Sequence, residues 1–315
     1  MQIYRFWTRA TGSASGRNGI IQTECLGYSN SSLEDALRVA QQRAGDVARR
    51  IAAGESIDAG YYPGSPIREE LVEEFSDESS GGQTLAAITR NSYGCLVLNT
   101  PSVFFADVDQ ENNAAGRSGG GQGSDGGGIF GALKGLFGQS DALDGLKEVM
   151  DQVQDTVEAF SGQPEGTDLA GTLKQIVASD SSLRLRLYRT MMGFRVLVTS
   201  RLIPATSPEA RDLLVRMGAD RLYASLCRTQ DCYRARLTPK AWRIGFKKPS
   251  VRFPFDAADS RQRMDQWLAD YEPHAAGYST CHLVGEFGDA PVHPAADRVA
   301  QLHDHYTLNG QLPLA

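Results

Sequence analysis

Two aspartates separated by one residue follow an apolar run and are the first group that could do chemistry. Asp107 and Asp109 come directly after Val103, Phe104, Phe105 and Ala106. On a strand, residues two apart share a face, so both carboxylates are expected on one side. Their hard oxygen ligands suit Mg²⁺ or Mn²⁺, which would orient and neutralise the phosphates of a bound triphosphate. The alternative, that both acids are ordinary loop caps, stays open.

A basic segment lies beyond the middle of the chain. Between positions 183 and 203 there is no acidic residue, and arginines alternate with apolar residues at Arg184, Arg186, Arg189, Arg195 and Arg201. A hairpin with this alternation would carry a row of guanidinium groups suited to bidentate contacts with phosphate. A solvent-exposed sheet face would alternate in the same way, and this second interpretation is kept.

Basic and aromatic residues are interleaved shortly afterwards. Arg236, Lys240 and Arg243 surround Trp242, and Phe246 and two lysines follow. A groove for a single-stranded nucleic acid needs this combination, because cations contact the backbone and rings stack on bases. The competing interpretation is a basic surface loop with Trp242 packed inward.

All five histidines fall in the last forty-two residues. Cys281, His282, His303 and His305 offer zinc ligand types, but their spacing fits no standard zinc motif, so structural roles are favoured. His303 or its neighbour Asp304 could instead face the acid pair, as a base or a third ligand.

The remaining pattern predicts the elements that must position these groups. Strands are expected at 2–8, 84–89, 95–98, 103–109, 183–188, 194–199, 232–237 and 280–284. Helices are expected at 32–53, 67–75, 167–178, 207–217, 221–226 and 264–271, with a last segment at 295–306. Gly193 is expected to supply the permissive turn residue of the basic hairpin.

Strands and helices mix without a regular alternating register, which predicts an α+β fold with a mixed, largely antiparallel sheet and flanking helices. From residue 111 the sequence becomes rich in Gly, Ser and Asn, which indicates a flexible insertion. We therefore divide the chain into an N-terminal half of the body (1–110), a glycine-rich linker with an inserted amphipathic helix (111–165) and a basic half that completes the body (166–315). The apolar segment 129–160 could dock a protein partner or cap the body.

Composition constrains the setting of the protein. The formal net charge is −6, but residues 183–263 contain 18 Lys and Arg against 6 Asp and Glu, so a local anionic partner is compatible with the acidic total. The sequence has no run of eighteen apolar residues, so stable membrane insertion is not expected, and no secretory signal is evident. The five scattered cysteines do not suggest a disulfide framework, and a cytoplasmic location is expected.

Several stretches together resemble a widespread bacterial family of uncharacterised proteins. They are ITRN (88–91), VLNT (97–100), FFADVD (104–109), LYRT (187–190), GFR (193–195), ARLTPK (235–240) and the pair His303-Asp304. The resemblance covers most of the chain outside roughly 111–165.

The pattern at 104–109 is also similar to the first motif of the archaeo-eukaryotic primase superfamily. That resemblance implies that Asp107 and Asp109 bind a catalytic metal, and that a later Ser-x-His motif contacts the nucleotide. Here the corresponding hairpin has Gly193, Phe194 and Arg195 with no histidine, and the third acidic motif has no clear match, with Asp220 or Asp231 as candidates.

The leading hypothesis is a metal-dependent enzyme of the nucleotidyl-transfer type, acting on a nucleotide or a single-stranded nucleic acid. Asp107 and Asp109 would hold Mg²⁺ or Mn²⁺, with His303 as a further catalytic candidate. A larger basic set would bind phosphate or guide a strand, namely Arg184, Arg186, Arg189, Arg195, Arg236, Lys240 and Arg243. The alternatives are a non-catalytic RNA- or DNA-binding protein and an interaction adaptor that docks through 129–160.

Overall fold

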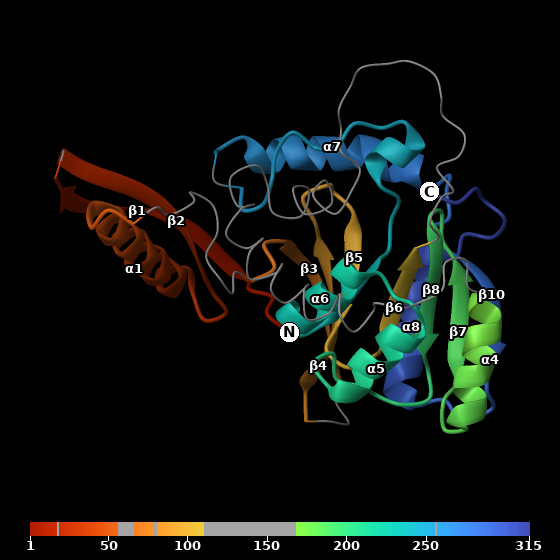
Figure 1. The fold of residues 1–315 in the computed structure, drawn as a ribbon. Helices are drawn as coiled ribbons and strands as arrows, with labels where there is room; N and C mark the ends of the chain where they lie inside the picture. Colours follow the sequence, from red (N-terminus) through yellow and green to blue (C-terminus); the bar gives the residue numbers. More distant parts are fainter. Residues whose placement is uncertain (18, 56–65, 78–80, 110–167, 256) are drawn as a thin grey trace, which may run out of the picture.

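The computed structural model describes residues 1–17, 19–55, 66–77, 81–109, 168–255 and 257–315 (Figure 1). The predicted glycine-rich insertion, its amphipathic helix and the docking segment 129–160 lie outside the described residues. The fold is α+β with antiparallel sheets, as the sequence predicted.

Two four-stranded antiparallel sheets form the body of the protein. The first has the order β3-β4-β5-β9, with bounds Glu70–Asp77, Gln83–Arg90, Leu96–Thr100 and Tyr233–Arg236. The second has the order β10-β7-β8-β6, with bounds His282–Phe287, Leu185–Arg189, Gly193–Val198 and Phe105–Asp109. Each sheet takes strands from both sides of residues 110–167, so neither is complete without both ends of the chain.

Helices cover the sheets and join them into one core. Their bounds are α4 Leu169–Ser179, α5 Pro208–Arg216, α6 Arg221–Gln230, the 3₁₀ helix η2 Ala241–Ile244, α7 Ser260–Ala275 and α8 Pro294–Thr307. In Figure 1, α4 and α5 lie on the near side of the second sheet and α8 on the far side. A single buried cluster includes Leu98 of β5, Phe105 of β6, Leu173 of α4 and Val299 of α8. Burial of this apolar area is the main source of stability.

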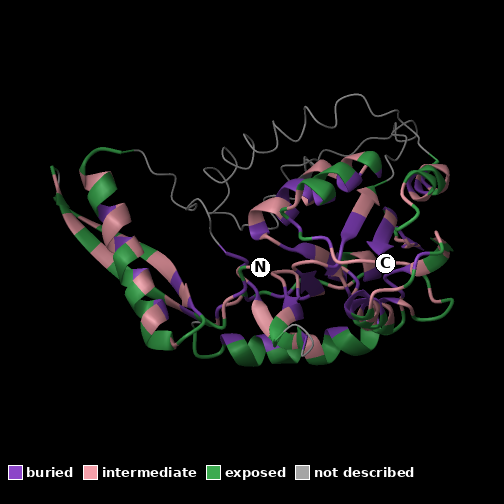
Figure 2. Cartoon of the chain, turned by 90° about the horizontal axis from the view of Figure 1, so that it is seen from below, coloured by how far each residue is buried: buried purple, intermediate pink, exposed green. Residues whose placement is uncertain are grey.

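An N-terminal arm projects from this body (Figure 1). It consists of the hairpin β1 (Phe6–Gly16) and β2 (Gly19–Ser29) and of helix α1 (Leu33–Ala52). The helix predicted at 32–53 is confirmed, and Ser32 caps it by accepting a hydrogen bond from the Asp35 amide at 3.1 Å. Figure 2 shows α1 with an exposed outer face, whereas the strands of the body are largely buried.

The structure corrects three local predictions. Residues 67–75 do not form an acidic helix; β3 occupies this region and pairs with β4. In this edge strand Glu73 and Glu74 are exposed, and exposed charges on an edge strand discourage edge-to-edge aggregation. Gly193 is the first residue of β8 and lies outside the turn. Strand β2 was not predicted at all.

Two further expectations bear on the setting. Among the described residues, no helix is both long and apolar enough to span a bilayer. All five cysteines are free thiols, and four of them are buried.

Candidate functional site

The antiparallel pairing of β6 with β8 places Asp107 directly opposite Arg195. Arg195 donates from Nε to Asp107 Oδ1 at 2.7 Å and from Nη2 to Oδ2 at 3.1 Å. The Arg195 side chain is 3% exposed and that of Asp107 is 32% exposed. The acid pair and the basic hairpin therefore do meet, but they meet as a bidentate ion pair.

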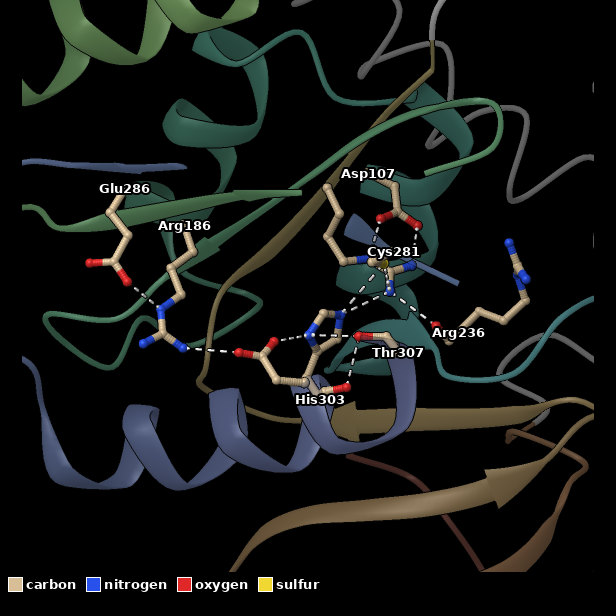
Figure 3. A network of polar contacts seen from close by, with 9 residues as sticks. Asp107, Arg186, Arg236, Cys281, Glu286, His303 and Thr307 are labelled. Atoms are coloured by element: carbon tan, nitrogen blue, oxygen red, sulfur yellow. Dashed lines mark hydrogen bonds and ion pairs between the residues drawn. The ribbon is translucent and has the colours of Figure 1, made fainter. Parts of the chain in front are cut away.

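The remaining Arg195 nitrogen joins three more residues into a buried network (Figure 3). Nη1 donates to the Arg236 carbonyl at 3.0 Å, lies 3.3 Å from His303 Nε2 and lies 3.9 Å from Cys281 Sγ. Burial alone would lower the pKa of Arg195, but Asp107 raises it, so the guanidinium is charged.

The Arg195 contact determines which nitrogen of His303 carries the proton. A guanidinium only donates, so Nε2 of His303 accepts and Nδ1 bears the hydrogen, which is donated to Asp304 Oδ1 at 2.9 Å. His303 is fully buried, and burial lowers its pKa, with Arg195 acting in the same direction and Asp304 opposing. His303 is thus a neutral ring that orients Arg195 and does not contact solvent.

The other arginines of the hairpin also have carboxylate partners. Arg184 and Arg186 pair with Glu286 of β10 at 2.6 and 2.9 Å, and Arg186 also pairs with Asp304 of α8 at 3.2 Å. The acids missing from 183–203 are therefore supplied by other elements. Arg189 is three residues from Arg186, so it projects from the opposite face, where its guanidinium lies 4.7 Å from the Phe194 ring centroid.

A second set of cations is not neutralised in this way. Arg236 ends β9, Lys240 precedes η2 and Arg243 lies within it. Arg236 donates to the Thr238 carbonyl at 3.1 Å and to an oxygen of Ala315, the last residue of the sequence, at 3.4 Å. Within the described ranges of the chain, none of the three forms an ion pair with a carboxylate side chain. We call Arg236, Lys240 and Arg243 the cationic cluster.

The charges of the cationic cluster act on one another. Burial, together with the charges of Arg236 and Arg243, lowers the pKa of Lys240 to about 8. Burial together with Arg236 lowers the pKa of Arg243 to about 10, and burial together with Arg195 lowers that of Arg236. Like charges are crowded here in a poorly hydrated place, which is unfavourable without an anion.

The loop that carries Lys240 is held from several sides. Cys95 and Tyr271 both donate to the Pro239 carbonyl, the former at 3.3 Å. Thr238 accepts from the Leu96 amide at 2.9 Å, and Thr280 donates to the Leu237 carbonyl at 3.0 Å. These hydrogen bonds from β5, α7 and the segment before β10 hold the loop of the cationic cluster in place.

Asp109 lies close to the cationic cluster. Its side chain reaches solvent, yet surrounding protein reduces its hydration and raises its pKa, and nearby Asp220 and Asp107 add to the rise. Lys240 and Arg243 act in the opposite direction. Asp220 is engaged as the cap of α6, accepting from the Tyr223 amide at 2.7 Å.

The residues present do not fit the predicted Mg²⁺ or Mn²⁺ site in this arrangement. Both oxygens of Asp107 accept from Arg195, and a divalent ion would have to compete with that guanidinium. In the part of the chain that the structure describes, no three His, Cys, Asp or Glu side chains are grouped to hold a metal ion.

The aromatic part of the predicted groove is exposed. Trp242 is 49% exposed, so the interpretation that it packs inward is wrong. The Lys240 ammonium lies 5.4 Å from its ring centroid, and the Tyr93 ring meets it edge to face at 4.9 Å.

Some residues of the site escaped the sequence prediction. Tyr93 was not among the predicted site residues, and its aromatic type beside Gly94 was the one local signal. Glu286 has no local signal, because its role follows from the β7–β10 register, in which it stands opposite Arg186.

Comparisons of this chain with protein-family models, with curated proteins and with solved structures find no match, so the primase resemblance stays a prediction and the case for function rests on geometry.

Proposed function

We propose that this protein binds a phosphate-bearing ligand, a nucleotide or a nucleic acid, through Arg236, Lys240 and Arg243. The observation that carries the proposal is that these three cations are brought together without the side chain of an Asp or Glu as an ion-pair partner among the described residues. Arg184, Arg186 and Arg195, by contrast, each have one.

The energetics favour an anion at this place. Isolated buried charges are costly, and proteins normally pair them with opposite charges. Here the depressed pKa of Lys240 reflects burial and repulsion from two arginines. A phosphate group would relieve this repulsion and accept charge-assisted hydrogen bonds from planar guanidinium groups.

The test is binding of a labelled oligonucleotide and a labelled nucleoside triphosphate to the full chain. The double variant Lys240→Met/Arg243→Met keeps most of the apolar stems and removes two charges, and we expect at least a tenfold loss of affinity. Arg38→Gln on α1 is the matched control, because Arg38 is an exposed arginine whose ion pair, among the described residues, is with Asp35. Unchanged binding by the double variant would overturn the proposal.

A second candidate is the nucleotidyl-transfer enzyme, which one observation favours. Asp109 lies beside the cationic cluster and, within the described residues, forms no ion pair, so it is available to a ligand bound there. Because the carboxylates do not fit a metal ion as arranged, we derive no catalytic step through one.

The enzyme is distinguished from the binding protein by incorporation of labelled nucleotides with Mg²⁺ or Mn²⁺ present. Asp109→Ala is the informative variant, since Asp107→Ala would also leave the buried Arg195 guanidinium without its carboxylate partner. Incorporation that is lost in Asp109→Ala at unchanged binding would support the enzyme. If the wild-type chain incorporates no nucleotide, the enzyme hypothesis is excluded and only the binding function remains.

A further inference from the structure

We infer that the ligand of the cationic cluster is a single-stranded nucleic acid, one of whose bases stacks on Trp242. The inference rests on the proposed function and specifies its substrate. It depends on three properties of the surface around η2: an exposed and fixed indole ring, unpaired cations beside it, and further cations along the same stretch of chain.

The indole ring is held in place while remaining exposed. Trp242 lies in η2 between Ala241 and Arg243, and the buried residues Ala241 and Ile244 anchor this short helix in a local core. Tyr93 buttresses the ring from the turn before β5. An exposed tryptophan that loses little freedom on binding is a good platform for stacking.

Two cations of the cluster flank the ring in the sequence, and one of them contacts it. Lys240 lies over the Trp242 ring itself, and Arg243 is the next residue along η2. A base on the indole would therefore bring its own phosphate to these side chains. A free phosphate or polyphosphate would use the cations and leave the indole exposed.

The positive surface continues along the chain. Lys247, Lys248 and Arg252 are all exposed, and the charge of Arg252 acts on Tyr93. These residues give a strand's backbone a path beyond the first phosphate. In a duplex the bases are already stacked on one another, so an unpaired strand is the form whose bases can reach Trp242.

The experiment compares strands that differ only in their bases. Full-length protein is titrated with an oligothymidylate, its RNA counterpart, an abasic strand of equal length and a duplex. We expect the two base-bearing strands to bind at least fivefold more tightly than the abasic strand. Trp242→Ala should lose about 5- to 150-fold in affinity for them, the equivalent of ~1–3 kcal/mol per stacked base. Trp242→Phe should retain most of the affinity.

Two controls separate this inference from the proposed function. Phe6→Ala removes another exposed aromatic ring, 36% exposed and located in the arm, and should change nothing. Trp242→Ala should leave the weak binding of the abasic strand unchanged, whereas Lys240→Met/Arg243→Met should reduce it. Equal affinity for abasic and base-bearing strands, or unaltered binding by Trp242→Ala, would overturn the stacking inference alone. Indifference of every strand to the double charge variant would overturn the proposed function as well.

Discussion

Arg195 contacts parts of the chain that are far apart in the sequence. Its guanidinium joins Asp107 of β6, the carbonyl of Arg236 in β9 and the ring of His303 in α8. Because β6 and β8 belong to one sheet and β9 to the other, this residue ties the two sheets together. We interpret Asp107, Arg195 and His303 as a structural network beside the proposed ligand site.

At the same scale, substitutions of Asp107 and Asp109 are expected to have very different effects on the free energy of unfolding. Asp107→Ala leaves the buried Arg195 charge without its partner and should lower the free energy of unfolding by about 2–4 kcal/mol. Asp109→Ala removes a carboxylate that forms no ion pair within the described residues, and should change stability by less than about 0.5 kcal/mol. Urea unfolding of both variants measures the difference. Equal losses would contradict the structural role of Asp107.

We expect the charge of Lys240 to lower the stability of the folded protein, although the same charge would favour a bound anion. Its folded-state pKa of about 8 lies below the ordinary 10.5, so between these pH values the unfolded chain binds more protons. Stability should therefore rise with pH across this window, and the charge is unfavourable at neutral pH. We expect Lys240→Met to increase the free energy of unfolding at pH 7 by about 1–3 kcal/mol. The gain should vanish above pH 10.5, and a constant gain would contradict this origin.

The same residue should make ligand binding depend on pH. Phosphodiesters stay charged throughout the range, so the affinity for an oligonucleotide should fall as pH rises through about 8, where Lys240 loses its proton. Lys240→Arg keeps its charge and should bind with nearly constant affinity from pH 7 to 9. Fluorescence anisotropy at a series of pH values provides the measurement, and identical profiles for both proteins would rule out Lys240 as the cause.

At the scale of elements, the arm shows how small residues allow close packing. Helix α1 buries Ala36, Ala40, Ala44 and Ala48, four residues apart on one face, against the hairpin. A Cβ atom on Gly27 would overlap the backbone of Ala36 and Ala40. The helix and the hairpin can approach this closely only because both surfaces lack bulk.

Gly27→Ala should therefore loosen the arm, by about 1–3 kcal/mol, because backbone atoms of α1 must move. The matched control is Gly45→Ala on α1, where the new methyl group meets only the end of Arg49 and helix propensity improves by about 1 kcal/mol. Hydrogen exchange of the α1 amides should be faster in the first variant and slower in the second. The body and its ligand site should be unaffected, so faster exchange throughout would show that the arm is not a separate unit.

At the scale of the whole molecule, the acidic total and the cationic cluster have a combined consequence. A net charge of −6 opposes general adhesion to nucleic acid, so binding depends on the few cations at the site. Three phosphate contacts from the cationic cluster at about −0.7 each give a slope of about −2 for the logarithm of the affinity against the logarithm of salt, and contacts from Lys247, Lys248 and Arg252 would bring it toward about −4. Titration from 50 to 200 mM salt gives the slope. A flat dependence would contradict phosphate contact, and a much steeper one would indicate a wider basic surface.

Much of the secondary structure follows from local sequence. Local patterns predicted helices at 32–53 and 207–217, where the structure has α1 and α5, and alternation predicted β7 and β8. The segment 67–75 was misassigned because Leu71 and Phe75 are four residues apart, as on a helix. Pairing with β4 makes this segment a strand, and the local sequence does not reveal that partner.

The sequence by itself determined which charges exist and the α+β class. It placed Asp107 and Asp109 on one strand, and Arg236, Lys240 and Arg243 close in sequence to Trp242. Only the tertiary structure decided how those charges are used. The partner of Arg195 is 88 residues away and that of Arg186 is 100 residues away. Such pairs depend on strand register and helix packing, which bring carboxylates to the hairpin and leave the cationic cluster without one.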